Sequence, residues 1–179
     1  SRGTPSPPMW ERRKSRWTTN DIAAADRGFR RSHGSGLVIA RRDIEAMIPH
    51  KGGMCLWDEV ADWDAQRIRL RTRSHHDAQN PLRHDDCLRA VHLCEYGAQA
   101  MAVHGGLRGA AAGEEPKIGF LVALRNIELR VGRIDDLADG LECEAELLAE
   151  SAASQQYAFR IVHAGQVVAE GRAAVMLQA

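Results

Sequence analysis

Residues 86–103 read DCLRAVHLCEYGAQAMAV, a segment with the composition and spacing of a helix that is apolar on nearly every side. A helix without a polar face is buried inside a domain. We expect Asp85 or Asp86 to cap its start and Gly105-Gly106 to end it. The apolar positions are Leu88, Val91, Leu93, Cys94, Ala98, Met101 and Val103. This segment therefore predicts one long central helix around which the remaining chain folds.

The sequence on both sides of this helix has the pattern of β-strands. Before it, residues 67–73 alternate apolar residues or threonine with arginines, as in a strand with one face in solvent. We predict a short helix over Asp43–Met47, strands over 54–61, 67–73, 119–131, 141–147, 157–161 and 167–177, a loop over Gly105–Pro116, and a tight turn at Ala164-Gly165. This order predicts an α+β domain in which an antiparallel sheet wraps around the central helix.

The 179 residues fit one domain with a terminal extension. Lys and Arg number 24, as do Asp and Glu, a balance that argues against binding to nucleic acid or to a membrane surface. Residues 1–36 are nevertheless basic, with eight Lys and Arg against three Asp and Glu. We interpret them as disordered or as an upstream extension, with a basic RNA-binding or lipid-binding arm as the alternative. The folded domain is expected over 37–179.

The four cysteines are scattered and form no CxxC pair. This usage indicates reduced thiols and a cytoplasmic protein rather than a disulfide framework or a zinc site. The sequence contains no secretory h-region and no apolar run of the length that spans a membrane.

Reactive side chains concentrate in residues 74–81, SHHDAQNP, and in the helix that follows. Glu95 lies within this apolar helix, where an ionised carboxylate is costly unless it is paired or hydrogen-bonded. A carboxylate in such a place is a candidate functional group. Gln99, one turn later, can orient it. The alternative is a wetter stripe of the helix formed by His92, Glu95 and Gln99.

Two motifs resemble the hot-dog-fold 3-hydroxyacyl-[acyl-carrier-protein] dehydratases. His76-x-x-x-Asn80-Pro81 is followed by residues 95–100, EYGAQA, and residues 48–60, IPHKGGMCLWDEV, are similar to the opening stretch of that family. The helix motif is most similar to the ApeP-like dehydratases of aryl-polyene biosynthesis. The resemblance extends over 39–177 and implies a hot-dog fold, with the sheet wrapped around the central helix.

The resemblance implies that His76 and Glu95 are catalytic and face each other across a homodimer interface. A neutral imidazole suits removal of the C2 proton, and a carboxyl that carries a proton suits departure of the hydroxyl. Backbone N–H groups near the helix start are expected to stabilise the thioester carbonyl. The further substrate-binding residues are Asn80, Pro81, Leu88, Val91 and Gln99. No cofactor or metal is required, and the expected partners are an acyl carrier protein and a second hot-dog subunit, identical or not.

The sequence also allows other assignments of the site residues and of the function. His75 replaces His76 if the strand register shifts by one residue, and His50 is interpreted as structural. A metal cluster would combine His75, His76, His84, Asp85 and Asp86. A hot-dog acyl thioesterase would use Glu95 to activate water. A catalytically silent partner subunit is favoured by residues 85–88, DDCL, which stand where the dehydratase family has a Pro-Gly turn.

Overall fold

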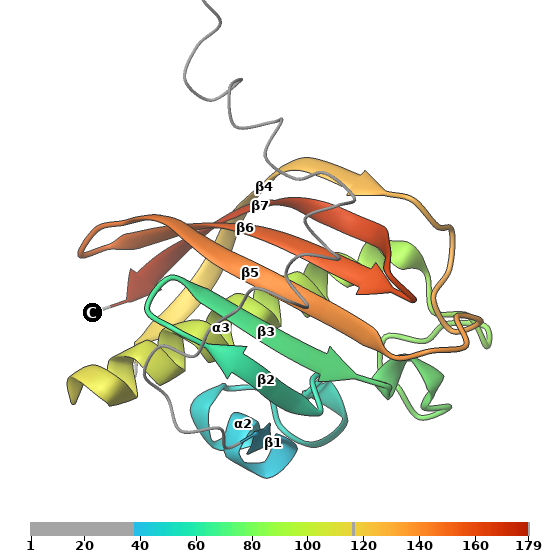
Figure 1. The fold of residues 1–179 in the computed structure, drawn as a ribbon, viewed down its shortest axis with the longest axis horizontal. Helices are drawn as coiled ribbons and strands as arrows, with labels where there is room; N and C mark the ends of the chain where they lie inside the picture. The colour runs from blue at the N-terminus through green and yellow to red at the C-terminus, as the bar shows by residue number, and fades with distance from the viewer. Residues whose placement is uncertain (1–37, 116, 179) are drawn as a thin grey trace, which may run out of the picture. The chain divides into compact units, whose positions relative to one another are not determined.

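An antiparallel sheet of seven strands curls around the long helix α3 (Figure 1). The strand order is β1-β2-β3-β5-β6-β7-β4, and all neighbouring pairs are antiparallel. The strands are β1 (Ile39–Ala40), β2 (Glu59–Trp63), β3 (Arg67–Thr72), β4 (Ile118–Leu129), β5 (Leu141–Glu150), β6 (Ser154–His163) and β7 (Gln166–Gln178). The helices are α2 (Arg41–Met47), α3 (Leu93–Ala112) and the 3-10 turns η2 (Gly52–Met54), η3 (Ser74–His76) and η4 (Ala90–His92). The α+β prediction is confirmed.

This computed structural model describes residues 38–115 and 117–178. The interpretation of residues 1–36 therefore lies outside the described residues. The described chain belongs to one folded unit.

The strands after α3 follow the predicted alternation closely. Leu141, Cys143 and Ala145 on β5 are buried, and so are the matching positions Tyr157, Phe159 and Ile161 on β6. The β6–β7 turn has positive φ at Ala164 (47°) and Gly165 (77°), as a two-residue hairpin turn requires. The arginine face of β3 is not simply solvated, because Arg67, Arg69 and Arg71 form ion pairs with glutamates on β5 and β2.

Both predicted ends of the central helix are wrong. Asp85 and Asp86 do not cap it, because both have positive φ in a tight turn between His84 and Cys87. The helix then continues through the two glycines at 105 and 106, so most of the predicted loop 105–116 is helical. The two glycines cost about 1 kcal/mol each relative to alanine, a cost that burial of Leu107 beyond them offsets. Gly113, with φ of 68°, ends the helix.

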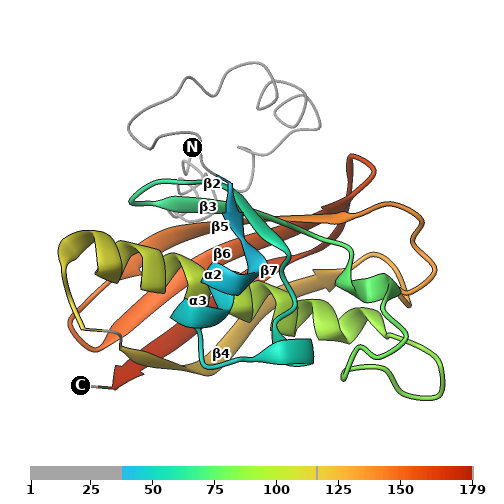
Figure 2. The same ribbon diagram turned by 90° about the horizontal axis from the view of Figure 1, so that it is seen from below.

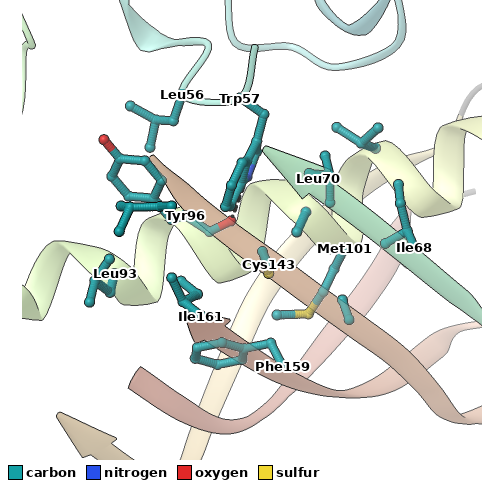
Figure 3. Packing of buried hydrophobic residues seen from close by; sticks show 14 of the residues in the cluster. Leu56, Trp57, Ile68, Leu70, Leu93, Tyr96, Met101, Cys143, Phe159 and Ile161 are labelled. Carbon is teal, nitrogen blue, oxygen red and sulfur yellow. Dashed lines mark hydrogen bonds between the residues drawn. The ribbon is translucent and has the colours of Figure 1, made fainter. Parts of the chain in front are cut away.

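The helix packs against β3, β5 and β6, and Figure 3 shows the core that this packing encloses. The helix approaches the sheet closely at Gly97, where a Cβ atom would lie 2.8 Å from the Phe159 ring. The residues labelled around this contact are Leu56, Trp57, Ile68, Leu70, Leu93, Tyr96, Met101, Cys143 and Ile161. Every residue from His92 to Gly109 is buried or half-buried, which confirms an enclosed helix.

The strand predicted over residues 54–61 begins later than expected, at Glu59. Leu56 and Trp57 are fully buried and bond to α3, and the Leu56 carbonyl also accepts from Thr72 Oγ1 on β3 at 2.6 Å. The Leu56 N–H donates to Gln99 Oε1 at 2.9 Å, and Trp57 Nε1 donates to the Tyr96 carbonyl at 2.9 Å. An apolar run therefore crosses the helix as irregular chain, because helix side chains and carbonyls satisfy its polar groups.

The sheet extends beyond the surface that α3 covers. Seven strands spaced about 4.8 Å apart are wider than one helix of about 10 Å diameter. Strand β4 pairs only with β7 and forms one edge of the sheet, and nearly all its side chains are exposed. The exposed large apolar side chains here are Ile118, Phe120, Leu121, Val122, Leu124, Leu129 and Met176. We call these seven residues the β4 edge patch.

Candidate active site

The connection between β3 and α3 folds against the amino-terminal end of α3 (Figure 2). Asp58 fixes where this connection begins, because its Oδ2 accepts from the Arg73 N–H at 2.7 Å and from Thr72 Oγ1 at 3.0 Å. Arg41 holds the other oxygen of the same carboxylate at 3.0 Å. The chain thus leaves β3 in a tight 3-10 turn, and this turn carries the two neighbouring histidines.

His75 and His76 differ in burial but share one acceptor. His75 is fully buried and His76 is exposed, yet the Nε2 atoms of both lie near the Leu137 carbonyl oxygen, at 3.2 and 2.5 Å. A 3-10 turn and not a strand carries the two rings, so both can approach the same carbonyl. Burial, and then the neighbouring His76, lower the pKa of His75.

A directed chain of hydrogen bonds joins this turn to α3. Asn80 Nδ2 lies 3.2 Å from the Tyr96 hydroxyl, which lies 2.9 Å from Ser74 Oγ, which in turn donates to the Leu56 carbonyl at 2.7 Å. Asn80 Nδ2 also donates to the Ser74 carbonyl at 3.0 Å. The amide of Asn80 is thus engaged by the protein and holds the loop, whereas Pro81 next to it is exposed.

Glu95 lies in the first turn of α3, with about a third of its side chain exposed (34%). The expected full burial is therefore wrong. Its Oε1 atom lies 3.4 Å from Gln99 Nε2, as the one-turn spacing predicted, and 3.5 Å from His50 Nε2. Gln99 is itself buried, and its Nε2 also donates to the Met54 carbonyl at 2.7 Å.

Sequence reasoning missed His50, which was interpreted as structural. The only sequence signal for it is the similarity of residues 48–60 to a family stretch, since nothing in the spacing links it to Glu95. Within the described residues, no ion pair or hydrogen bond joins His76 to Glu95. The predicted arrangement of that pair across two subunits concerns a second chain.

Most backbone donors at the start of α3 are occupied. The Leu88 N–H donates to Asp135 Oδ1 at 2.9 Å, and the Ala90 N–H donates to the Gly132 carbonyl at 3.1 Å. The N–H of Val91 has no hydrogen bond to any described residue, and the Val91 side chain is exposed while Leu88 is fully buried. Among the backbone groups from Leu88 to Val91, the N–H groups of Arg89 and Val91 have no hydrogen bond within the described residues, and both side chains are exposed.

A hollow of about 670 Å³ lies beside this helix start. It is lined by Cys87, Arg89, Val131, Gly132, Arg133, Asp136 and Leu137. Arg133 pairs with Asp135 and Asp136, and its hydrogen bond to Asp135 keeps the pKa of that carboxyl far below its usual range. Since Leu137 lines the hollow and also accepts from His76, this hollow and the histidine turn are neighbours.

The described residues contain no group of three or more His, Cys, Asp or Glu side chains that could hold a metal ion, so the five-residue cluster considered above does not assemble among them. All four cysteines are free. None of the helices in the described ranges has the length and hydropathy needed to cross a membrane.

Comparison with known proteins gave one family match. Residues 42–179 match the ApeP-like family, described as ApeP dehydratase. A comparison with curated proteins gave no match.

Solved structures with a similar fold include enzymes of two kinds. The dehydratase heterocomplex ApeI:P from Xenorhabdus doucetiae matches with 19% identity and a TM-score of 0.69, over 76% of this chain and 91% of the other. A hypothetical thioesterase with coenzyme A from Streptococcus pneumoniae TIGR4 matches with 14% identity and a TM-score of 0.51, over 68% and 88%. AziG from S. sahachiroi matches with 13% identity and a TM-score of 0.50, over 66% and 88%. These likenesses confirm the hot-dog fold.

Proposed function

The chain belongs to the ApeP-like dehydratase family, and from this premise we propose that it removes water from a 3-hydroxyacyl thioester carried by an acyl carrier protein. The product is a trans-2-enoyl thioester. The observation that carries the proposal is the setting of Glu95, in the first turn of the central helix. Its Oε1 is held by neighbouring side chains, while no hydrogen bond from the described residues reaches its Oε2. One oxygen is thus oriented and the other is available to a substrate.

The proposed reaction is an acid–base elimination. The His76 imidazole takes the C2 proton, the electrons of that C–H bond form the C2–C3 double bond, and the C3–O bond breaks. The leaving hydroxyl takes the proton of the Glu95 carboxyl and departs as water. Return of a proton from His76 to Glu95 through solvent restores the starting state. The Val91 N–H is our candidate for stabilising the charge on the thioester oxygen.

We propose that a second hot-dog subunit completes the site. Within the described residues no hydrogen bond or ion pair joins His76 to Glu95 of the same chain, so His76 would meet the Glu95 of a partner. The β4 edge patch supports such a partner, because apolar side chains and an unpaired strand edge are costly in water. The Xenorhabdus doucetiae structure is named as a heterocomplex, which supports a partner subunit that differs from this chain.

The remaining substrate contacts stand as proposals. Pro81 and Val91 are exposed and can contact the acyl chain directly, whereas Asn80, Leu88 and Gln99 are buried and would shape the wall behind them. An acyl carrier protein is acidic, and Arg89 at the hollow beside the histidine turn offers it a positive charge. We place the reaction in aryl-polyene or related lipid biosynthesis in the cytoplasm, where four free thiols would stay reduced.

The test uses the full chain, alone and co-expressed with a second hot-dog subunit, and a 3-hydroxyacyl-acyl carrier protein as substrate. Enoyl product is followed by absorbance and identified by mass. Glu95→Gln and His76→Ala should each reduce its formation by about 10²- to 10⁴-fold. His84→Ala, an exposed histidine away from both, is the matched control.

Other products would overturn this proposal in distinct ways. Free acid, formed at the same rate by His76→Ala, would identify a thioesterase in which Glu95 activates water. Turnover by the co-expressed complex that survives Glu95→Gln and His76→Ala in this chain would identify a catalytically silent partner subunit.

A further inference from the structure

His50 lies against the carboxylate of Glu95 although it comes from a distant part of the chain. It follows α2 and Pro49, and its Nε2 atom lies 3.5 Å from Glu95 Oε1. Both side chains are about one-third exposed, at 33% and 34%. The two groups therefore meet at the rim of the site, where a substrate can reach the carboxylate.

The segment that carries His50 is fastened to α3 close to this contact. Gln99 bonds to it twice, since its Oε1 accepts from the Leu56 N–H at 2.9 Å and its Nε2 donates to the Met54 carbonyl at 2.7 Å. Arg41 donates to the Gly52 carbonyl at 2.9 Å. Because the chain is anchored just after His50, the imidazole position is determined by the fold.

The His50 ring also has a specific orientation. Its Nδ1 atom is buried and has no hydrogen-bond partner among the described residues. A buried N–H without an acceptor costs more than a buried lone pair, so the hydrogen is expected on Nε2, the atom that faces Glu95. His50 Nε2 and Gln99 Nε2 thus approach the same oxygen, Oε1, and neither approaches Oε2.

We propose that His50 is a positioning residue that holds Glu95 Oε1, so that Oε2 carries the proton delivered to the leaving hydroxyl. This inference rests on the proposed dehydratase function and adds a second histidine to it. His76 acts on the substrate carbon, and His50 acts through Glu95 from within the same chain. When two N–H groups fix one oxygen of a carboxylate, the other oxygen points in one direction. The carboxylate is then oriented for the reaction before the substrate binds.

The test compares His50→Ala, which removes the donor, with His50→Gln, which keeps an N–H at a similar reach. His50→Ala should lower kcat by about tenfold to a hundredfold with little change in KM. His50→Gln should restore kcat to within about threefold of wild type, and His84→Ala should leave both constants unchanged. Equal activity of His50→Ala and wild type would overturn the inference, as would a loss that His50→Gln does not rescue.

A second measurement tests the contact between His50 and Glu95 without enzyme turnover. Nitrogen-15 NMR of the imidazoles should show His50 with its hydrogen on Nε2, and Glu95→Gln should shift that resonance. A His50 resonance that does not respond to Glu95→Gln would overturn the contact. Absence of enoyl product from wild type with a partner would instead overturn the proposed function and, with it, the catalytic use of the contact.

Discussion

The rings of His75 and His76 lie 4.0 Å apart between centroids, and both direct Nε2 at the carbonyl oxygen of Leu137. One acceptor thus joins the turn after β3 to the connection between β4 and β5. The neighbouring His76 adds to burial in lowering the pKa of His75, since two imidazolium groups at this distance would repel each other.

The first prediction concerns the dependence of stability on pH. Burial lowers the pKa of His75 and of His104 in the folded protein, whereas both are near 6.5 when unfolded. As the pH falls below that value, the unfolded chain binds more protons than the folded protein does. The contribution of these two histidines to the free energy of unfolding is therefore complete above about pH 6.5 and decreases below it. Urea midpoints measured between about pH 7.5 and 5.5 should decrease accordingly.

His75→Gln should weaken this dependence, and His84→Gln, at an exposed position, should not. Carboxylates titrate at lower pH and contribute little in this range. An unchanged midpoint over the whole range would contradict the prediction.

The second prediction concerns the close contact of α3 with the sheet at Gly97. Gly97→Ala places a methyl group 2.8 Å from the Phe159 ring and should destabilise the fold by about 1–3 kcal/mol. Gly109→Ala, on the same helix with nothing within 4 Å, should stabilise it by about 0.5–1 kcal/mol. Denaturant unfolding measures the free energy of unfolding of each variant. Changes of the same sign and size in the two variants would refute close packing at Gly97.

The third prediction concerns the two tyrosines of the chain. Burial raises the pKa of Tyr96, and it raises the pKa of Tyr157 to about 12. A titration of the folded protein should therefore show less tyrosinate absorbance near pH 10 than the chain in concentrated urea, where both groups titrate at that pH. The folded protein keeps these protons to a higher pH than the unfolded chain does. The contribution of the two tyrosines to the free energy of unfolding is therefore complete below about pH 10 and decreases above it.

The fourth prediction concerns the β4 edge patch. Val122→Glu puts a charge into the patch and should separate the proposed dimer into monomers in light scattering, with the subunit still folded. Leu148→Glu replaces an exposed apolar residue on β5, outside the patch, and should leave the dimer intact. A dimer that survives Val122→Glu would show that the partner lies elsewhere.

Local periodicity predicted most of the elements because their burial is regular. The alternation over 141–147 and 157–161 corresponds to β5 and β6, and the apolar segment 86–103 corresponds to the enclosed part of α3. The boundaries failed where tertiary contacts override local signals. Gly105-Gly106 lies inside α3, and Leu56-Trp57 crosses α3 without forming a strand.

The sequence by itself determined the fold, since a helix that is apolar on all sides requires a sheet to enclose it. It also determined that Glu95 lies on the central helix, because this carboxylate interrupts an otherwise apolar segment. Only the tertiary structure decided which groups meet that carboxylate. It brought His50 to Glu95 and His76 to Leu137, because the connection before β2 and the turn after β3 are held in place by hydrogen bonds between distant residues. Such contacts depend on how the chain closes in three dimensions, and no local pattern encodes them.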